Sequence, residues 1–105
     1  MAQFDIYRNE NPATRSRYPY VLDIQAELLS ELPTRLVVPR RDGTGTEPWI
    51  VSRLHPVLKL GDNTLIAVFS EMAAVPASIL GNKVGDARVQ RADLIAAMDL
   101  LVTGF

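Results

Sequence analysis

The chain has 105 residues, no cysteine, one histidine and a formal net charge of −1. This length favours a single domain over residues 1–105, and the missing cysteines exclude disulfides, thiolate nucleophiles and cysteine-based metal sites. One histidine does not make a histidine-rich metal centre, so we expect no metal and no cofactor. The near-neutral charge disfavours a uniformly basic surface for nucleic acid, and a domain this small would gain buried area by forming a homodimer.

Targeting signals are also missing from the sequence. Residues 1–5 carry no basic segment followed by an apolar run, and no stretch of about 18 apolar residues follows later. We therefore expect a soluble cytoplasmic protein that does not associate with membranes.

Strand patterns dominate the first half of the chain. Phe4 and Ile6 alternate with Gln3, Asp5 and Tyr7, which predicts a first strand with Phe4 and Ile6 on a buried face and the other three on an exposed face. A polar, exposed loop is expected over 8–17, a second strand over 18–24, and a helical turn over 26–32 that ends at Pro33. A short strand over 35–39 should stop at Pro39 and lead into a flexible loop over 40–48.

The second half is predicted to contain a hairpin and the one long helix. Two β-rich runs, 54–60 and 64–69, flank Gly61-Asp62-Asn63, a sequence typical of a hairpin turn. A short strand over 72–76 and a loop over 81–86 should follow. The pattern from 87 to 105 predicts a helix, so the fold class is α+β, mainly antiparallel β.

Helical spacing separates two faces on that last segment. One is an apolar arc that should pack on the core, formed by Leu94, Ile95, Met98, Leu101, Val102 and Phe105. The opposite stripe is polar or small and should be exposed or closely approached, with Arg88, Ala92, Ala96, Asp99 and Thr103. The chain ends one residue beyond Gly104, and Phe105 either packs back on the core or meets a partner.

Catalytic motifs are weak. His55 precedes a proline and has no acidic neighbour, so a structural histidine at a strand surface is the favoured interpretation. The serines at 16, 30, 52 and 70 have no nucleophile-elbow pattern, and Gly43-Thr44-Gly45 lacks the rest of a phosphate-binding motif. We expect no catalytic residues and no enzymatic activity.

The arginines admit two interpretations. Arg15 and Arg17 lie in the first loop, and Arg40 and Arg41 begin the second, which leads to the single Trp49. Arginines beside an aromatic residue on loops can grip an acidic peptide or an RNA backbone. Ordinary solvated loop charge explains them equally well.

Several motifs, in order along nearly the whole chain, resemble CcdB toxins. They are Gln3-Phe4-x-Ile6-Tyr7, the run from Tyr18 to Gln25, Arg35-Leu36-Val37-Val38-Pro39, the hairpin from Pro56 to Asp62, Met72-Ala73-Ala74-Val75-Pro76, Ile79-Leu80-Gly81 and the ending in Gly104 plus one hydrophobic residue. The resemblance implies an SH3-like barrel of the CcdB/MazF toxin fold with a C-terminal helix. It also implies a homodimer with both helix ends side by side.

By the same resemblance, the chain would be a non-enzymatic toxin of a type II toxin–antitoxin system, concerned with plasmid maintenance and transcription autoregulation. It would trap the DNA gyrase A subunit on cleaved DNA, and a CcdA-like antitoxin with a disordered acidic tail would neutralise it. Carried over by position, the gyrase contacts are Ala26, Leu28, Leu29, Asp99, Thr103, Gly104 and Phe105. The antitoxin contacts are Arg8, Arg15, Arg17, Arg40, Arg41 and Trp49.

The tail departs from the family pattern. Thr103-Gly104-Phe105 stands where the family has Trp-Gly-Ile, and Asp99 replaces an asparagine. Loss of the tryptophan removes a stacking contact of about 0.5–2 kcal/mol, which predicts weaker gyrase poisoning. Two alternatives stay open: a MazF-like endoribonuclease on the same fold, and a CcdB-like protein that has lost its activity on gyrase.

Overall fold

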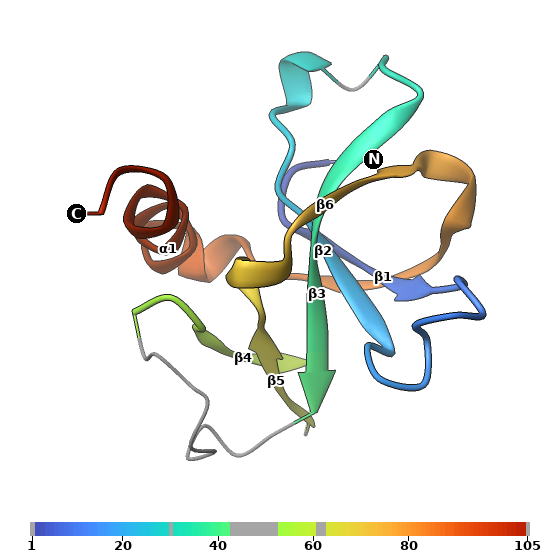
Figure 1. Ribbon diagram of the computed structural model, residues 1–105, viewed down its shortest axis with the longest axis horizontal. Helices are drawn as coiled ribbons and strands as arrows, with labels where there is room; N and C mark the ends of the chain where they lie inside the picture. The colour runs from blue at the N-terminus through green and yellow to red at the C-terminus, as the bar shows by residue number, and fades with distance from the viewer. Residues whose placement is uncertain (1, 30, 43–52, 61–62, 105) are drawn as a thin grey trace.

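The structure is a computed structural model that describes residues 2–29, 31–42, 53–60 and 63–104, without the side chains of residues 41, 42 and 63 (Figure 1). Its strands are β1 (Asp5–Asn9), β2 (Tyr20–Asp23), β3 (Thr34–Asp42), β4 (Val57–Leu60), β5 (Asn63–Ala67), β6 (Ala73–Pro76) and β7 (Leu80–Asp86). Its helices are the 3-10 turns η1 (Glu27–Leu29), η2 (Phe69–Glu71), η3 (Ala77–Ile79) and η4 (Arg88–Gln90), and the α-helix α1 (Arg91–Thr103).

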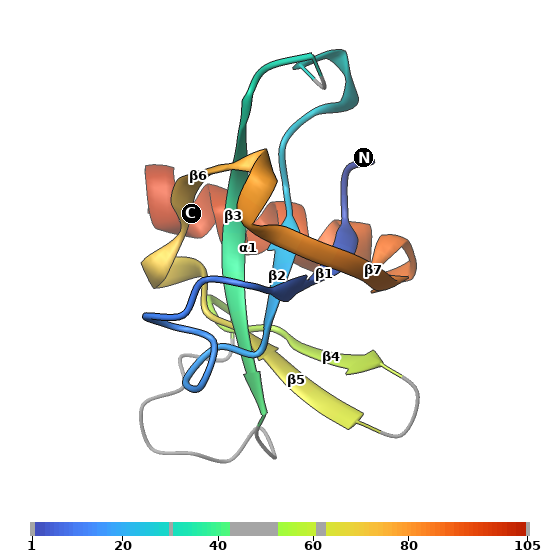
Figure 2. The same cartoon turned by 90° about the vertical axis from the view of Figure 1, so that its right-hand side faces the viewer.

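The strands form one curled antiparallel sheet in the order β4-β5-β3-β2-β1-β7. The long β3 pairs with β2 along one edge, and along its other edge with β6 over 34–37 and then with β5 over 40–42. In Figure 2, α1 lies behind the sheet, and the loop after β1 lies in front of it. This arrangement confirms the predicted α+β fold with a curled β-sheet and a C-terminal helix.

Pro39 lies inside β3 and does not end it, contrary to the prediction. Its carbonyl accepts a hydrogen bond from the Val68 N–H on the edge away from β2. Because the N–H and C=O of one strand residue point to the same side, the donor that proline lacks would face the gap between β6 and β5. The change of partner strand is what allows a proline here.

The predicted loop over 81–86 is also wrong, because these residues belong to β7. They pair with β1 through a register that shifts at two places. At Gly81 and Gly85, the side chains of Glu10 and Leu60 come within 3 Å of the point that a Cβ atom would occupy. Glycine at these two places permits the close approach, although it reads as a loop signal in sequence.

Other predicted elements are confirmed. The turn over 26–32 contains η1, and 72–76 contains β6. The hairpin of β4 and β5 is present, but Asn63 already pairs with Leu60, so the turn is one residue shorter than predicted.

The core has two parts, one on each face of the sheet. The larger contains Ile6, Leu22, Val38, Leu58 and Phe69, together with Leu94 and Ala97 of α1. The smaller contains Tyr7, Val21 and Val37, with Val75 and Leu80 packed against it. Both faces of β1 are therefore buried, and the prediction that Asp5 and Tyr7 lie on an exposed face is wrong.

Asp23 and Arg35 form an ion pair inside the protein. Both side chains are 0% exposed, and the Arg35 Nε and Nη2 donate to Asp23 Oδ2 at 2.9 and 2.6 Å. The other carboxylate oxygen accepts the Gln25 N–H at 3.0 Å. Burial raises the pKa of Asp23, although the hydrogen bonds from Gln25 and Arg35 oppose this. The pair joins β2 to β3 across the sheet.

Asp5 anchors the N-terminal segment to β7 and η4. Its carboxylate accepts hydrogen bonds from the Ala2 N–H and the Tyr7 hydroxyl, and pairs with Lys83 at 3.1 Å and Arg88 at 2.9 Å. Burial alone would raise the pKa of Asp5, but these donors outweigh it and lower the pKa. Burial and Asp5 also raise the pKa of Tyr7 to about 12.

We expect Asp5→Asn to lower the free energy of unfolding by about 1–3 kcal/mol at neutral pH, because charged donors lose their acceptor. A lowered pKa means that the ionised Asp5 stabilises the fold above the ordinary value of 3.8, and that this stabilisation is lost as the pH falls through the folded pKa. Urea unfolding across the acid range measures it. The difference in free energy of unfolding between Asp5→Asn and the wild type should shrink toward low pH. A difference that does not change with pH would contradict this explanation.

Arg40 is buried inside β3, so its predicted place in an exposed loop is wrong. It pairs with Tyr20 and Ala67, and its side chain is 0% exposed. Within the described part of the chain its three guanidinium nitrogens have no hydrogen-bond partner. Burial lowers the pKa of Arg40 to about 9, so it remains charged at neutral pH. A covered side chain offers no contact surface, so we do not propose Arg40 as an antitoxin contact.

Arg40→Met should raise the free energy of unfolding by about 1–4 kcal/mol, because an uncompensated buried charge is replaced by an apolar side chain of similar length. The stability advantage of Arg40→Met over the wild type should narrow above about pH 9. There the folded wild type releases a proton that the unfolded chain still holds, so the free energy of unfolding of the wild type rises with pH. Urea unfolding at about pH 7 and pH 10 tests both points, with the exposed Arg15→Met as control. A destabilised Arg40→Met would mean that the guanidinium has a stabilising partner.

Candidate functional site

The C-terminal end of α1 projects from the body of the protein (Figure 1). Asp99, Thr103 and Gly104 are exposed, and the Thr103 hydroxyl donates to the Asp99 carbonyl at 2.7 Å. Gly104 has a φ of 80° and donates its N–H to the Leu100 carbonyl, a left-handed helix end that glycine adopts without strain. Three of the predicted gyrase contacts therefore share one surface, and Phe105 lies outside the described residues.

The apolar arc predicted for this helix only partly packs on the core. Leu94 is buried and Met98 half-buried, but Ile95 and Leu101 are exposed, and Val102 is 71% exposed. Ala97, which the arc did not include, is fully buried instead. The face that packs is thus rotated toward Ala97, and the prediction of a packed arc is wrong for Ile95, Leu101 and Val102. The C-terminal part of α1 therefore carries exposed apolar side chains.

The predicted contacts in the turn are also exposed. Ala26 and Leu29 are exposed, and Leu28 is 92% exposed in η1. The buried Gln25 holds this turn, because its side chain donates to the Leu29 carbonyl at 2.8 Å and accepts from the Leu36 N–H at 3.0 Å. Leu28 therefore lies on a turn that the hydrogen bonds of Gln25 hold in place.

Hydrogen bonds connect the start of α1 to the strand that leads into η1. The Arg91 guanidinium donates to Gln3 Oε1 at 3.1 Å and lies 5.6 Å from the centre of the Phe4 ring. The Gln3 amide in turn donates to the Ile24 carbonyl at 3.2 Å, next to Gln25. The N-terminal segment thus links the start of α1 to Ile24, which precedes the turn that contains η1.

The predicted antitoxin contacts fall into three groups. Arg8 is exposed on β1, and Arg15 and Arg17 are exposed on the loop after it. Arg40 is buried, as described above. The Arg41 side chain and Trp49 lie outside the described residues.

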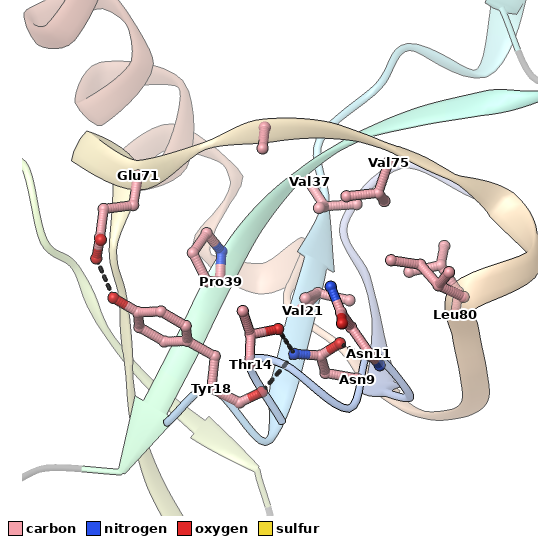
Figure 3. A pocket seen from close by; sticks show the side chains of 12 residues that line it. Asn9, Asn11, Thr14, Tyr18, Val21, Val37, Pro39, Glu71, Val75 and Leu80 are labelled. Atoms are coloured by element: carbon pink, nitrogen blue, oxygen red, sulfur yellow. Dashed lines mark hydrogen bonds between the residues drawn. The ribbon is translucent and has the colours of Figure 1, made fainter. Parts of the chain in front are cut away.

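The structure contains a pocket that the sequence did not predict (Figure 3). It has a volume of about 210 Å³ and lies on the smaller core, on the face of the sheet away from α1. Its lining residues come from several elements: Asn9, Asn11, Thr14, Tyr18, Val21, Val37, Pro39, Glu71, Ala73, Val75, Ile79 and Leu80. Alternating valines in three strands indicate a second apolar face of the sheet. No local sequence motif indicates that the loop after β1 leaves a pocket above that face.

His55 is 5% exposed and lies just before β4, so its predicted place at a strand surface is wrong. Its Nε2 lies 3.1 Å from Ser70 Oγ, and this pairing was not predicted. Among the described residues, no cluster of three or more His, Asp or Glu side chains could hold a metal ion. In the same part of the chain, no helix is both long and apolar enough to cross a membrane.

Comparison with known proteins matches the chain to a family and to solved structures of similar fold. The family model described as "CcdB protein" matches residues 3–104. A solved structure, described as the crystal structure of an Mtb toxin, matches with a TM-score of 0.61 and 16% sequence identity. That match covers 82% of this chain and 91% of the other, and at this identity it concerns the fold alone.

Proposed function

The chain belongs to the CcdB family, and from this membership we propose that it is the toxin of a type II toxin–antitoxin system and poisons DNA gyrase. It acts as a homodimer in the cytoplasm, without enzymatic activity, by trapping gyrase on cleaved DNA. The observation that carries the proposal is the exposed end of α1, where Asp99, Thr103 and Gly104 stand free beside the apolar Val102. Its cognate antitoxin neutralises it.

The exposed apolar residues of α1 also support the homodimer. Ile95, Leu101 and Val102 leave one side of the helix uncovered in a single chain. Small domains bury little of their surface alone, so pairing through this side would stabilise them. Asp99 and Thr103 lie on the polar stripe that borders this side of the helix, so a dimer would leave them at its edge for gyrase.

The test is a cleavage assay with supercoiled plasmid, gyrase and ATP. The purified protein should convert the plasmid to linear DNA, and gyrase with a toxin-resistant A subunit serves as control. If a folded dimer at high concentration yields no linear DNA, the proposal fails. The alternative, a CcdB-like protein that has lost its activity on gyrase, is then favoured. RNA incubated without gyrase should stay intact, since cleavage would instead identify a MazF-like ribonuclease.

A further inference from the structure

Phe4 has a backbone conformation that aromatic residues seldom adopt. Its φ is 69°, and among the described residues it is the only one other than glycine with a positive φ. In this left-handed region the Cβ atom crowds the backbone, which strains a residue with a bulky side chain. Strain of this kind persists only where the surrounding structure holds the residue in place. The neighbours of Phe4 therefore indicate what its conformation maintains.

Two backbone hydrogen bonds hold Phe4 between β2 and the residue that follows β7. Its N–H donates to the Asp23 carbonyl at 2.6 Å, and its carbonyl accepts from the Ala87 N–H at 2.8 Å. These two partners lie on opposite sides of β1, because β2 and β7 flank that strand. An extended residue points its N–H and C=O toward the same edge of a strand, so it would not bond to both neighbours. The left-handed conformation is what lets Phe4 reach both.

The phenyl ring and two neighbouring side chains extend this link to α1. The ring is 3% exposed in the larger core, and the Arg91 guanidinium lies 5.6 Å from its centre. Arg91 is the first residue of α1, and it also donates to Gln3 Oε1 at 3.1 Å. The Gln3 amide donates to the Ile24 carbonyl at 3.2 Å, directly after β2. Residues 3 and 4 thus hold the start of α1 to the end of β2 through both backbone and side chains.

The direction of α1 depends on its first half. Leu94 and Ala97 are its buried residues, and residues 101–104 are all exposed. A helix of 13 residues is about 20 Å long, so a tilt of about 10° at its start would move its end by roughly 3 Å. On the other side of the link, Ile24 leads into the turn that carries the exposed Leu28. The link therefore determines how far the end of α1 lies from η1.

We propose that Phe4 is a positioning residue, whose strained backbone joins α1 to β2 and thereby fixes the exposed end of α1 relative to the η1 turn. This rests on the proposed function only for its consequence, which is that gyrase contacts both surfaces at once. Two surfaces that are held at a fixed separation bind a partner more tightly than two that move independently, because less entropy is lost on binding. Filling the core alone would not require a left-handed backbone.

Two isomeric side chains separate positioning from core filling. Phe4→Leu and Phe4→Ile remove the same ring and add the same number of carbon atoms, but only isoleucine is branched at Cβ and resists a positive φ. If the left-handed backbone positions α1, Phe4→Ile should disturb the helix much more than Phe4→Leu. A role in core filling alone predicts similar effects for both variants.

Pulsed electron paramagnetic resonance measures the position of α1 directly. The chain has no cysteine, so Glu27→Cys in η1 and Thr103→Cys at the end of α1, both at exposed positions, can each carry a spin label. Refolding with an excess of unlabelled protein restricts the measured distances to one chain. Relative to Phe4→Leu, Phe4→Ile should shift the mean distance by roughly 3 Å or broaden its distribution about twofold. Equal distributions in the two variants would overturn the proposal.

A surface substitution decides the question if Phe4→Ile does not fold. Arg91→Met removes the guanidinium from the Phe4 ring and from Gln3, and it leaves the core side chains in place. Arg17→Met is its control, because the Arg17 guanidinium lies 6.0 Å from the centre of the Tyr18 ring, on the loop after β1. Arg91→Met should broaden the distance distribution between the two labels, and Arg17→Met should not. The same distribution in both would contradict the proposal.

The gyrase assay separates this inference from the proposed function. Phe4→Ile should need about tenfold more protein than Phe4→Leu for half-maximal linearisation of plasmid, because its two contact surfaces are no longer held together. Thermal melts confirm that each variant is folded at the assay temperature. If the wild type never linearises plasmid but the distances change as expected, gyrase poisoning fails and the positioning of α1 by Phe4 stands. If the wild type linearises plasmid and the two variants are equally active, the inference fails alone.

Discussion

Replacing Asp23 with asparagine is expected to lower the free energy of unfolding by about 3–5 kcal/mol. The change keeps the shape of the side chain, but it leaves the fully buried Arg35 without its carboxylate. Arg40 is already a buried cation without a hydrogen-bond partner among the described residues, so the fold would carry two.

Urea unfolding of Asp23→Asn measures this loss, and the double variant Asp23→Leu with Arg35→Met is its control. Removing both charges together should recover most of the stability, because neither is then left uncompensated. If the single and double variants are equally destabilised, packing rather than charge explains the effect.

Truncation after Thr103 should abolish toxicity while antitoxin affinity stays within about twofold. Gly104 ends α1 at the exposed surface proposed to meet gyrase, whereas the exposed arginines expected to contact the antitoxin lie on β1 and the loop after it. A few residues at the centre of an interface carry most of its binding energy. Growth arrest on expression in a sensitive strain measures the first effect and calorimetry the second.

A point substitution refines the same test. Val102→Glu places a charge on the exposed apolar end of α1, and Val89→Glu places the same charge on η4, where Val89 is 96% exposed. Only Val102→Glu should reduce toxicity or dimer formation. Full toxicity of the truncated chain would show that the tail is not needed, and equal losses in both glutamate variants would point to a general effect of added charge.

Local signals determine some elements of this protein without the rest of the fold. The run Gly61-Asp62-Asn63 between two β-rich segments predicts the hairpin because turn chemistry acts over a few residues. The same holds for η1, which ends before Pro33, and for the terminal helix. The family is likewise readable, since its motifs stand in order from Gln3 to Gly104.

Positions that depend on a distant partner strand were predicted wrongly. Pro39 predicts the end of a strand, yet β3 continues through it. Its missing N–H donor lies where the partner of β3 changes from β6 to β5. The glycines of β7 read as a loop, yet they admit Glu10 and Leu60 at close range. Arg40 reads as a loop cation, yet strands on both sides enclose it. In each case the neighbour lies about 15 residues or more away, beyond the reach of local propensity.

The candidate site divides in the same way. The exposure of Asp99 and Thr103 follows from their place on a polar stripe at a helix end, which helical periodicity alone determines. Only the tertiary structure decided that Val102 stays exposed, because the core contacts α1 through Leu94 and Ala97. Only the tertiary structure formed the pocket, because its walls come from β2, β3, β6 and β7 and meet nowhere in the sequence. Periodicity is a property of one segment, whereas a hollow exists only between segments that have packed together.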